Sequence, residues 1–213
     1  MTVPELLDRL ESHYGPQKPS WPVDPYEFLI WWHCGYPASD VRCARGWEEL
    51  QKIGISPAEL LAASPKALTA ALKPGGMVPE LRALRLKEIA QRVEHEFGGD
   101  FRRATKRAAL KKFPNIGDPG ADRILLFGGV SPLAAVPSNC PHVLVRIQRG
   151  NVRLNYGVVY RQAQEAIELE VARTPEARQR AFLLLKEHGQ ALCKAAKPKC
   201  GECPVRAECR FTV

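Results

Sequence analysis

Four cysteines near the end of the chain have the residue type and the spacing to bind a metal centre. They follow a C-x6-C-x2-C-x5-C pattern, as Cys193, Cys200, Cys203 and Cys209. Four thiolates this close together can surround one compact inorganic centre, and a cubane [4Fe–4S] cluster requires four cysteine sulfurs. A four-cysteine zinc site is an alternative, although zinc modules usually pair their cysteines at short spacing and only the middle pair does so here. Two disulfides would require an oxidising compartment, and we expect no signal peptide.

This order of gaps resembles the iron–sulfur loop of the endonuclease III family, in the helix–hairpin–helix DNA glycosylase superfamily. The resemblance implies that the four cysteines hold a [4Fe–4S] cluster. Basic residues surround them, namely Lys194, Lys197, Lys199, Arg206 and Arg210. Because a cubane with four thiolates is negatively charged, nearby cations offset its charge. The remaining basic side chains are free to face phosphate, and a solvated basic tail is the alternative.

A second candidate site is the turn in the stretch 110–121, which reads LKKFPNIGDPGA and resembles a helix–hairpin–helix. A tight turn of this kind presents backbone N–H groups at a helix N-terminus, where a phosphate can bind. Gly117 stands at the second glycine of the usual G-x-G. Asn115 replaces the first glycine, which is tolerable because asparagine also adopts positive φ. An ordinary hairpin of two helices is the alternative.

Basic side chains precede this turn. Lys111 and Lys112 lie directly before it, and Arg102, Arg103, Lys106 and Arg107 come slightly earlier. Such cations bind the phosphates of DNA. They position the duplex without reading its sequence.

The catalytic groups of the resembled family are absent from their expected positions. The resemblance places the catalytic aspartate at Pro137 and the lysine of bifunctional members at Pro119. No carboxylate stands between Arg123 and Gln164, so a small shift of the alignment does not restore one. A glycosylase needs a carboxylate near the anomeric carbon, and a Schiff-base lyase needs the lysine. We therefore expect a non-standard active site and no lyase activity by that route.

Two residues are candidates for the missing group. Asp122 lies three residues after Pro119, on the same helix face. His33 lies near the place where adenine-excising relatives carry a catalytic glutamate, and an imidazole there can titrate near neutrality. The alternatives are a solvated helix position for Asp122 and a packed or solvated ring for His33. Pro37 aligns with the residue that fills the gap left by a flipped base, and an apolar wedge there can hold bases apart.

The composition is that of a soluble globular protein with a basic surface. The chain has 213 residues, of which 45% are hydrophobic and 25% charged, and its formal net charge is +8. This charge favours a polyanionic partner. No apolar run approaches the length of a membrane span. We expect a monomer in a reducing cytoplasm, associated with the nucleoid in a bacterium, with Cys34, Cys43 and Cys140 as small buried side chains.

Helical periodicity runs through the chain, and no segment alternates as a strand would, so the predicted class is all-α. Helices are expected at 4–14, 26–34, 40–51, 56–63, 65–72, 79–97, 101–112, 119–128, 142–148, 158–171 and 175–191. Asp24 is expected to cap the second helix, and Gly98 to end the one that begins at Pro79. The resemblance implies two helical domains with a DNA-binding cleft between them. One is a barrel over residues 24–128, with the helix–hairpin–helix at about 110–127; the other joins 1–23 to 129–213 and carries the cluster.

Two functional hypotheses follow. In the first, the protein is a DNA glycosylase-like protein of base excision repair, which flips a base from damaged or mismatched double-stranded DNA and releases it with a replaced catalytic group. In the second, it is a non-catalytic member that binds a lesion or a DNA shape. The missing aspartate and lysine favour the second hypothesis or an unusual substrate. The hairpin and the cysteine loop predict DNA binding in both.

Overall fold

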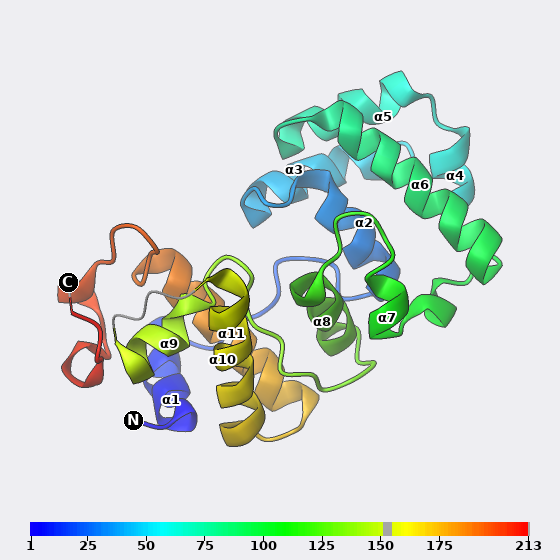
Figure 1. Ribbon diagram of the computed structural model, residues 1–213. Helices are drawn as coiled ribbons and strands as arrows, with labels where there is room; N and C mark the ends of the chain where they lie inside the picture. Colours follow the sequence, from blue (N-terminus) through cyan, green and yellow to red (C-terminus); the bar gives the residue numbers. More distant parts are fainter. Residues whose placement is uncertain (151–154, 213) are drawn as a thin grey trace. The chain divides into compact units, whose positions relative to one another are not determined.

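The computed structural model describes residues 1–150 and 155–212, and every regular element in these ranges is a helix (Figure 1). The predicted all-α class is confirmed. The α-helices are α1 (Val3–Tyr14), α2 (Pro25–Gly35), α3 (Asp40–Gln51), α4 (Pro57–Ala62), α5 (Pro65–Leu72), α6 (Pro79–Phe97), α7 (Arg107–Leu110), α8 (Asp118–Phe127), α9 (His142–Arg149), α10 (Tyr156–Glu170) and α11 (Pro175–Ala191). Short 3-10 helices are η1 (Lys73–Gly75), η2 (Phe101–Ala104), η3 (Cys200–Glu202) and η4 (Arg206–Glu208).

Local signals in the sequence determine where several helices begin and end. The Asp24 carboxylate accepts hydrogen bonds from the backbone N–H groups of Tyr26 and Glu27, at 2.9 and 3.0 Å, so the predicted cap is confirmed. α6 ends at Gly98, whose φ of 64° is the left-handed conformation that favours glycine. These two signals fix the start of α2 and the end of α6.

The segment 101–112, predicted as one helix, is broken in the structure. η2 ends at Ala104 and α7 begins only at Arg107. Between them, the Thr105 hydroxyl donates a hydrogen bond to the carbonyl oxygen of Arg102 at 2.6 Å, and Lys106 is extended at φ −121° and ψ 137°. A hydroxyl bonded to a nearby carbonyl offers the backbone an alternative to the helix. The prediction of a continuous helix was therefore wrong, and Lys111 and Lys112 lie beyond the end of α7.

The chain divides into two compact units. One comprises Met1–Lys18 and Leu125–Val213, and the other comprises Pro19–Ile124. The first unit has a core shared by α1, α9, α10 and α11, with Leu10, Leu144, Ile167 and Leu184 buried. In the second unit α2 packs on α3, and α6 packs on both α4 and α5. Removing these apolar faces from water is the main force that holds each unit together.

Three cysteines outside the C-terminal loop are buried, as predicted: Cys34, Cys43 and Cys140 are 0%, 1% and 3% exposed. Burial raises the pKa of each of their thiols, so they are protonated near neutral pH. In the described residues, none of the helices combines the length and the apolar character that crossing a membrane requires.

Candidate nucleic-acid interface and cysteine loop

The turn between α7 and α8 contains the residues predicted to bind phosphate. Asn115 has a φ of 56°, so the left-handed conformation expected for it is confirmed. Asn115 and Gly117 are both exposed. A Cβ atom on Gly117 would meet nothing closer than Cδ of Pro119, at 3.8 Å, and its φ lies outside the left-handed region. The packing of the chain itself therefore does not require glycine at position 117.

Two side chains from neighbouring helices hold the carbonyl groups of this turn. Nε2 of His33, in α2, lies 2.8 Å from the carbonyl oxygen of Pro114. Nη1 of Arg92, in α6, donates a hydrogen bond to the carbonyl oxygen of Lys112, and its guanidinium lies over the ring of Phe113. Both contacts lie within the unit Pro19–Ile124, so this unit by itself restrains the conformation of the turn.

His33 is packed inside this unit, with an exposed fraction of 1%. Its Nδ1 lies 2.8 Å from the carbonyl oxygen of Leu29, so both ring nitrogens face carbonyl oxygens. Burial lowers the pKa of His33 to about 4, against the opposing effect of these two carbonyl groups. Near neutral pH the ring is thus neutral and donates only one of the two hydrogen bonds. The structure thus favours the packed ring that the sequence left open, and a catalytic role for His33 stays a prediction.

Asp122 is fully buried and ion-paired, and it is not the solvated residue that the sequence left open. Nε of Arg107 donates to its Oδ1 at 2.6 Å, and Nη2 donates to its Oδ2 at 3.2 Å. A bidentate guanidinium compensates the buried negative charge. Arg107, expected to face phosphate, also pairs with Asp118 at 3.1 Å. These contacts favour a structural role for Asp122, whose catalytic role stays a prediction.

The two lysines before the turn differ in how their charges are engaged. Nζ of Lys111 lies 2.6 Å from Oδ1 of Asp118. The hydrogen bond from Lys111 and the nearby Arg107 hold the pKa of Asp118 below its ordinary value. Lys112 is exposed, and no carboxylate among the described residues pairs with it. The charge of Lys112 is therefore more available to an external anion than that of Lys111.

Pro37 and Pro137 lie in different surroundings. By resemblance, Pro37 is the wedge between bases and Pro137 stands at the position of the catalytic aspartate. Pro37 is exposed in the turn that follows α2. Pro137 is buried in the loop between α8 and α9, next to Ala134, Ala135 and Val136, which are at most 3% exposed. The residues around Pro137 along the chain are thus apolar and packed, and none of them is a carboxylate.

The four C-terminal cysteines line one cavity. Cys193 follows α11, Cys200 begins η3, and Cys203 and Cys209 directly follow η3 and η4. All four are half-buried, and none of the described cysteines forms a disulfide. Among the described residues no group of three or more His, Cys, Asp or Glu side chains has the geometry of a metal-ion site, so the assignment of ligands stays a prediction. Four thiols around a single cavity are nevertheless the donor set that a cubane cluster uses.

Polar groups from distant parts of the chain contact these thiols. Nη1 of Arg146, in α9, lies 3.8 Å from Sγ of Cys193 and donates to the carbonyl oxygen of Lys194 at 2.8 Å. Nε2 of His188, in α11, lies 3.7 Å from Sγ of Cys203, and its Nδ1 lies 2.9 Å from the hydroxyl of Tyr14. Such contacts orient ligands and tune a metal centre. No spacing in the sequence indicates such contacts, because Tyr14 and His188, for example, are 174 residues apart.

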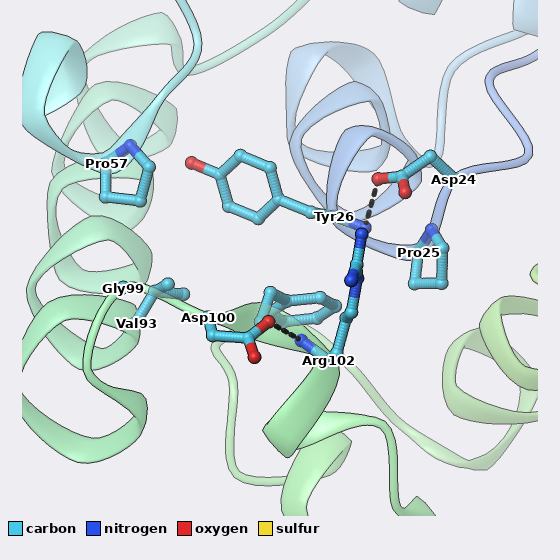
Figure 2. A pocket seen from close by; sticks show the side chains of 9 residues that line it. Asp24, Pro25, Tyr26, Pro57, Val93, Gly99, Asp100 and Arg102 are labelled. Carbon is cyan, nitrogen blue, oxygen red and sulfur yellow. Dashed lines mark hydrogen bonds between the residues drawn. The ribbon is translucent and has the colours of Figure 1, made fainter.

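Another cavity in the unit Pro19–Ile124 contains Arg102, one of the predicted phosphate-binding cations, but none of the candidate catalytic residues or cysteines (Figure 2). It has a volume of about 170 Å³ and is lined in part by Asp24, Tyr26, Asp100 and Arg102. Asp24 caps α2, and Asp100 accepts a hydrogen bond from the backbone N–H of Arg102 at 3.1 Å. The Tyr26 hydroxyl donates to the carbonyl oxygen of Ile55 at 2.7 Å. Because its polar groups serve the local structure, we do not assign the site to this cavity.

Comparison with known proteins supports the predicted fold. No protein-family model matches the sequence. Endonuclease III of Thermotoga maritima is 27% identical over 190 residues, which cover 89% of this chain and 84% of that protein. The thymine/uracil-DNA glycosylase of Pyrobaculum aerophilum is 28% identical over 150 residues, which cover 70% of this chain but only 64% of that protein.

Among solved structures, an endonuclease III trapped in a covalent intermediate with DNA aligns with a TM-score of 0.81. The alignment covers 99% of this chain and 96% of that chain, at 17% sequence identity. The protein therefore has the endonuclease III-like helix–hairpin–helix fold, as the resemblance predicted.

Proposed function

We propose that this protein binds double-stranded DNA through the turn between α7 and α8, and that it is a DNA glycosylase-like protein of base excision repair. The observation that carries the proposal is the backbone of the turn, where Asn115 has positive φ and Gly117 is open to close approach. N–H groups at the start of α8, together with the helix dipole, favour a phosphate. Similarity to endonuclease III structures determined with DNA supports this proposal.

Exposed cations supply the electrostatic part of the proposed binding. Lys112, next to the turn, has no carboxylate partner within the described part of the chain, and Lys111 shares its charge with Asp118. Each phosphate that such a side chain neutralises releases counterions, so affinity falls as salt rises. Pro37, exposed on the same unit, is the proposed wedge between bases.

The proposed base release requires a non-standard active site. The curated relatives include a thymine/uracil-DNA glycosylase and a thymine-DNA glycosylase, so damaged or mismatched pyrimidines are the first substrates to test. Position 137 is a buried proline and position 119 is a proline, which leaves no aspartate or Schiff-base lysine at those places. Asp122 and His33 stay the proposed replacements.

The non-catalytic alternative is favoured by a specific observation. Both replacement candidates are buried and already engaged, Asp122 with Arg107 and His33 with two carbonyl groups. A group that must reach the sugar of a flipped base needs access to it. In this alternative the protein binds a DNA lesion or shape through the same turn and releases no base.

We also propose that Cys193, Cys200, Cys203 and Cys209 hold a [4Fe–4S] cluster. The proposal is supported by their unusual spacing and by the one cavity that all four line. Arg146, at the Sγ of Cys193, supplies positive charge that offsets the charge of the thiolates. When bound, the cluster cross-links the loop by metal–thiolate bonds.

Single-turnover base release from a panel of uracil, thymine-mismatch and damaged duplexes tests the proposal. The assay is run beside Asp122→Asn and His33→Gln, with the half-buried Asp118→Asn as control. Release that is lost in one buried variant but kept in the control identifies the catalytic group. No release with salt-sensitive duplex binding supports the non-catalytic alternative. Absence of salt-sensitive duplex binding contradicts both.

A further inference from the structure

A groove between α5 and α6 lies outside the proposed DNA contacts. The two helices run next to each other in the unit Pro19–Ile124 (Figure 1). The hollow between them has a volume of about 430 Å³, within the range of ligand-binding clefts. Its lining residues recur every three or four positions along each helix, so each helix contributes one face. They include Lys66, Ala70 and Lys73 from the α5 side and Glu80, Ala83, Leu84 and Lys87 from α6.

The floor of this groove is apolar and accessible. Ala70 and Leu84 are exposed, and the exposed fraction of Leu84 is 63%. Exposed apolar side chains gathered at a concave surface are typical of sites that bind another molecule.

The rim of the groove is positively charged. Lys66 and Lys73 are exposed, and among the described residues neither has an ion-pair partner. Lys87 donates a hydrogen bond from its Nζ to the carbonyl oxygen of Leu61 at 2.8 Å. Glu80 is the acidic residue among the lining side chains. A ligand of this groove should therefore combine apolar groups with negative charge.

We propose that the groove binds an acidic amphipathic helix of a protein partner. Apolar side chains of such a helix would cover Leu84 and Ala70, and carboxylates on its flanks would meet Lys66 and Lys73. Duplex DNA fits less well, because an apolar floor offers nothing to a phosphate backbone. A second copy of this chain also fits less well, because its net charge of +8 opposes the rim.

The test uses the full chain and a fluorescein-labelled peptide helix of about sixteen residues, with leucine at positions i, i+3, i+4 and i+7 and glutamate elsewhere. Fluorescence anisotropy should show binding to the wild-type protein. The double variant Lys66→Glu with Lys73→Glu should bind about tenfold more weakly, and Leu84→Asp at least as weakly. All three residues are exposed, so the substitutions leave the core intact. The matched control, Lys18→Glu with Lys52→Glu, changes the same charge on exposed lysines elsewhere and should keep the affinity.

Three outcomes would overturn the inference. They are no binding of the acidic peptide, equal binding by the groove variants and the control, and equal binding of a peptide that carries lysine in place of glutamate. Duplex affinity is measured on the same variants. Its loss in the groove variants, without peptide binding, would assign the groove to DNA instead. Unchanged duplex affinity with lost peptide binding supports the inference and leaves the proposed DNA function untouched.

Discussion

The turn between α7 and α8 and the cysteine loop both gather basic side chains, but their conformations have different origins. The carbonyl groups of the turn are bound by Arg92 and His33. The regular structure of the cysteine loop is limited to η3 and η4, of three residues each, and its thiols face a cavity. The turn is therefore shaped by contacts that the chain itself provides, whereas the proposed cluster adds the bonds that join the four thiols.

The largest effect is expected for the cysteine loop. Cys200→Ser removes one proposed ligand, so iron content should fall to about half or less and the broad visible absorption of thiolate-bound iron should bleach. Iron analysis and absorbance of the purified protein measure this. Cys43→Ala changes a buried cysteine outside the loop, so this variant should keep both its iron content and its visible absorbance. Unchanged iron and absorbance in Cys200→Ser would contradict the cluster assignment.

The buried imidazole of His33, in α2, should make the stability of the protein depend on pH. The pKa of His33 is lowered from 6.5 to about 4 by burial, so protonation of the unfolded chain opposes folding. Its contribution is present in full above the unfolded pKa and is lost as pH falls through the folded pKa, by up to about 3 kcal/mol. Urea unfolding between pH 7 and 4 should show this loss in the wild type and a flatter profile in His33→Gln. The exposed His95→Gln is the control, and parallel profiles for wild type and His33→Gln would refute the prediction.

The ion pair between Asp122 and Arg107 should contribute a smaller amount to the free energy of unfolding. Asp122→Asn removes the charge that Arg107 pairs with inside the unit. Because Arg107 is 43% exposed and keeps its pair with Asp118, we expect a loss of about 1–3 kcal/mol, below that of a fully buried pair. The free energy of unfolding in urea measures it. Asp118→Asn, at the less buried carboxylate of the network, should lower the free energy of unfolding by a smaller amount. An equal loss in the two variants would contradict the greater weight given to the buried pair.

The smallest expected effect is a difference between Lys111 and Lys112 in how each contributes to the salt dependence of DNA binding. Lys112→Ala should lower the slope of the logarithm of DNA affinity against the logarithm of salt by about one. Lys111→Ala should lower it less, because the charge of Lys111 is partly neutralised by Asp118. Fluorescence anisotropy with a short duplex at several salt concentrations measures both slopes. Equal changes would show that the pair with Asp118 opens when DNA binds.

Helix caps and local backbone conformation were predictable from the sequence, and contacts between residues far apart in the chain were not. The cap at Asp24, the end of α6 at Gly98 and the positive φ of Asn115 depend on a few neighbouring residues, and each was anticipated. The contact of His33 with Pro114 joins residues 81 positions apart, and no spacing rule predicts it. The break at Thr105 was missed because a side-chain hydrogen bond outweighed the helical periodicity.

The open surroundings of Gly117 have a consequence for sequence variation. The fold does not need glycine there, since neither its φ nor a neighbouring atom excludes a methyl group. A library of variants selected only for folding should therefore accept alanine at this position. A library selected for duplex binding should reject it, because a Cβ would stand where the proposed phosphate approaches the backbone. Sequencing the two surviving populations would separate the demands of the fold from those of the ligand at a single residue.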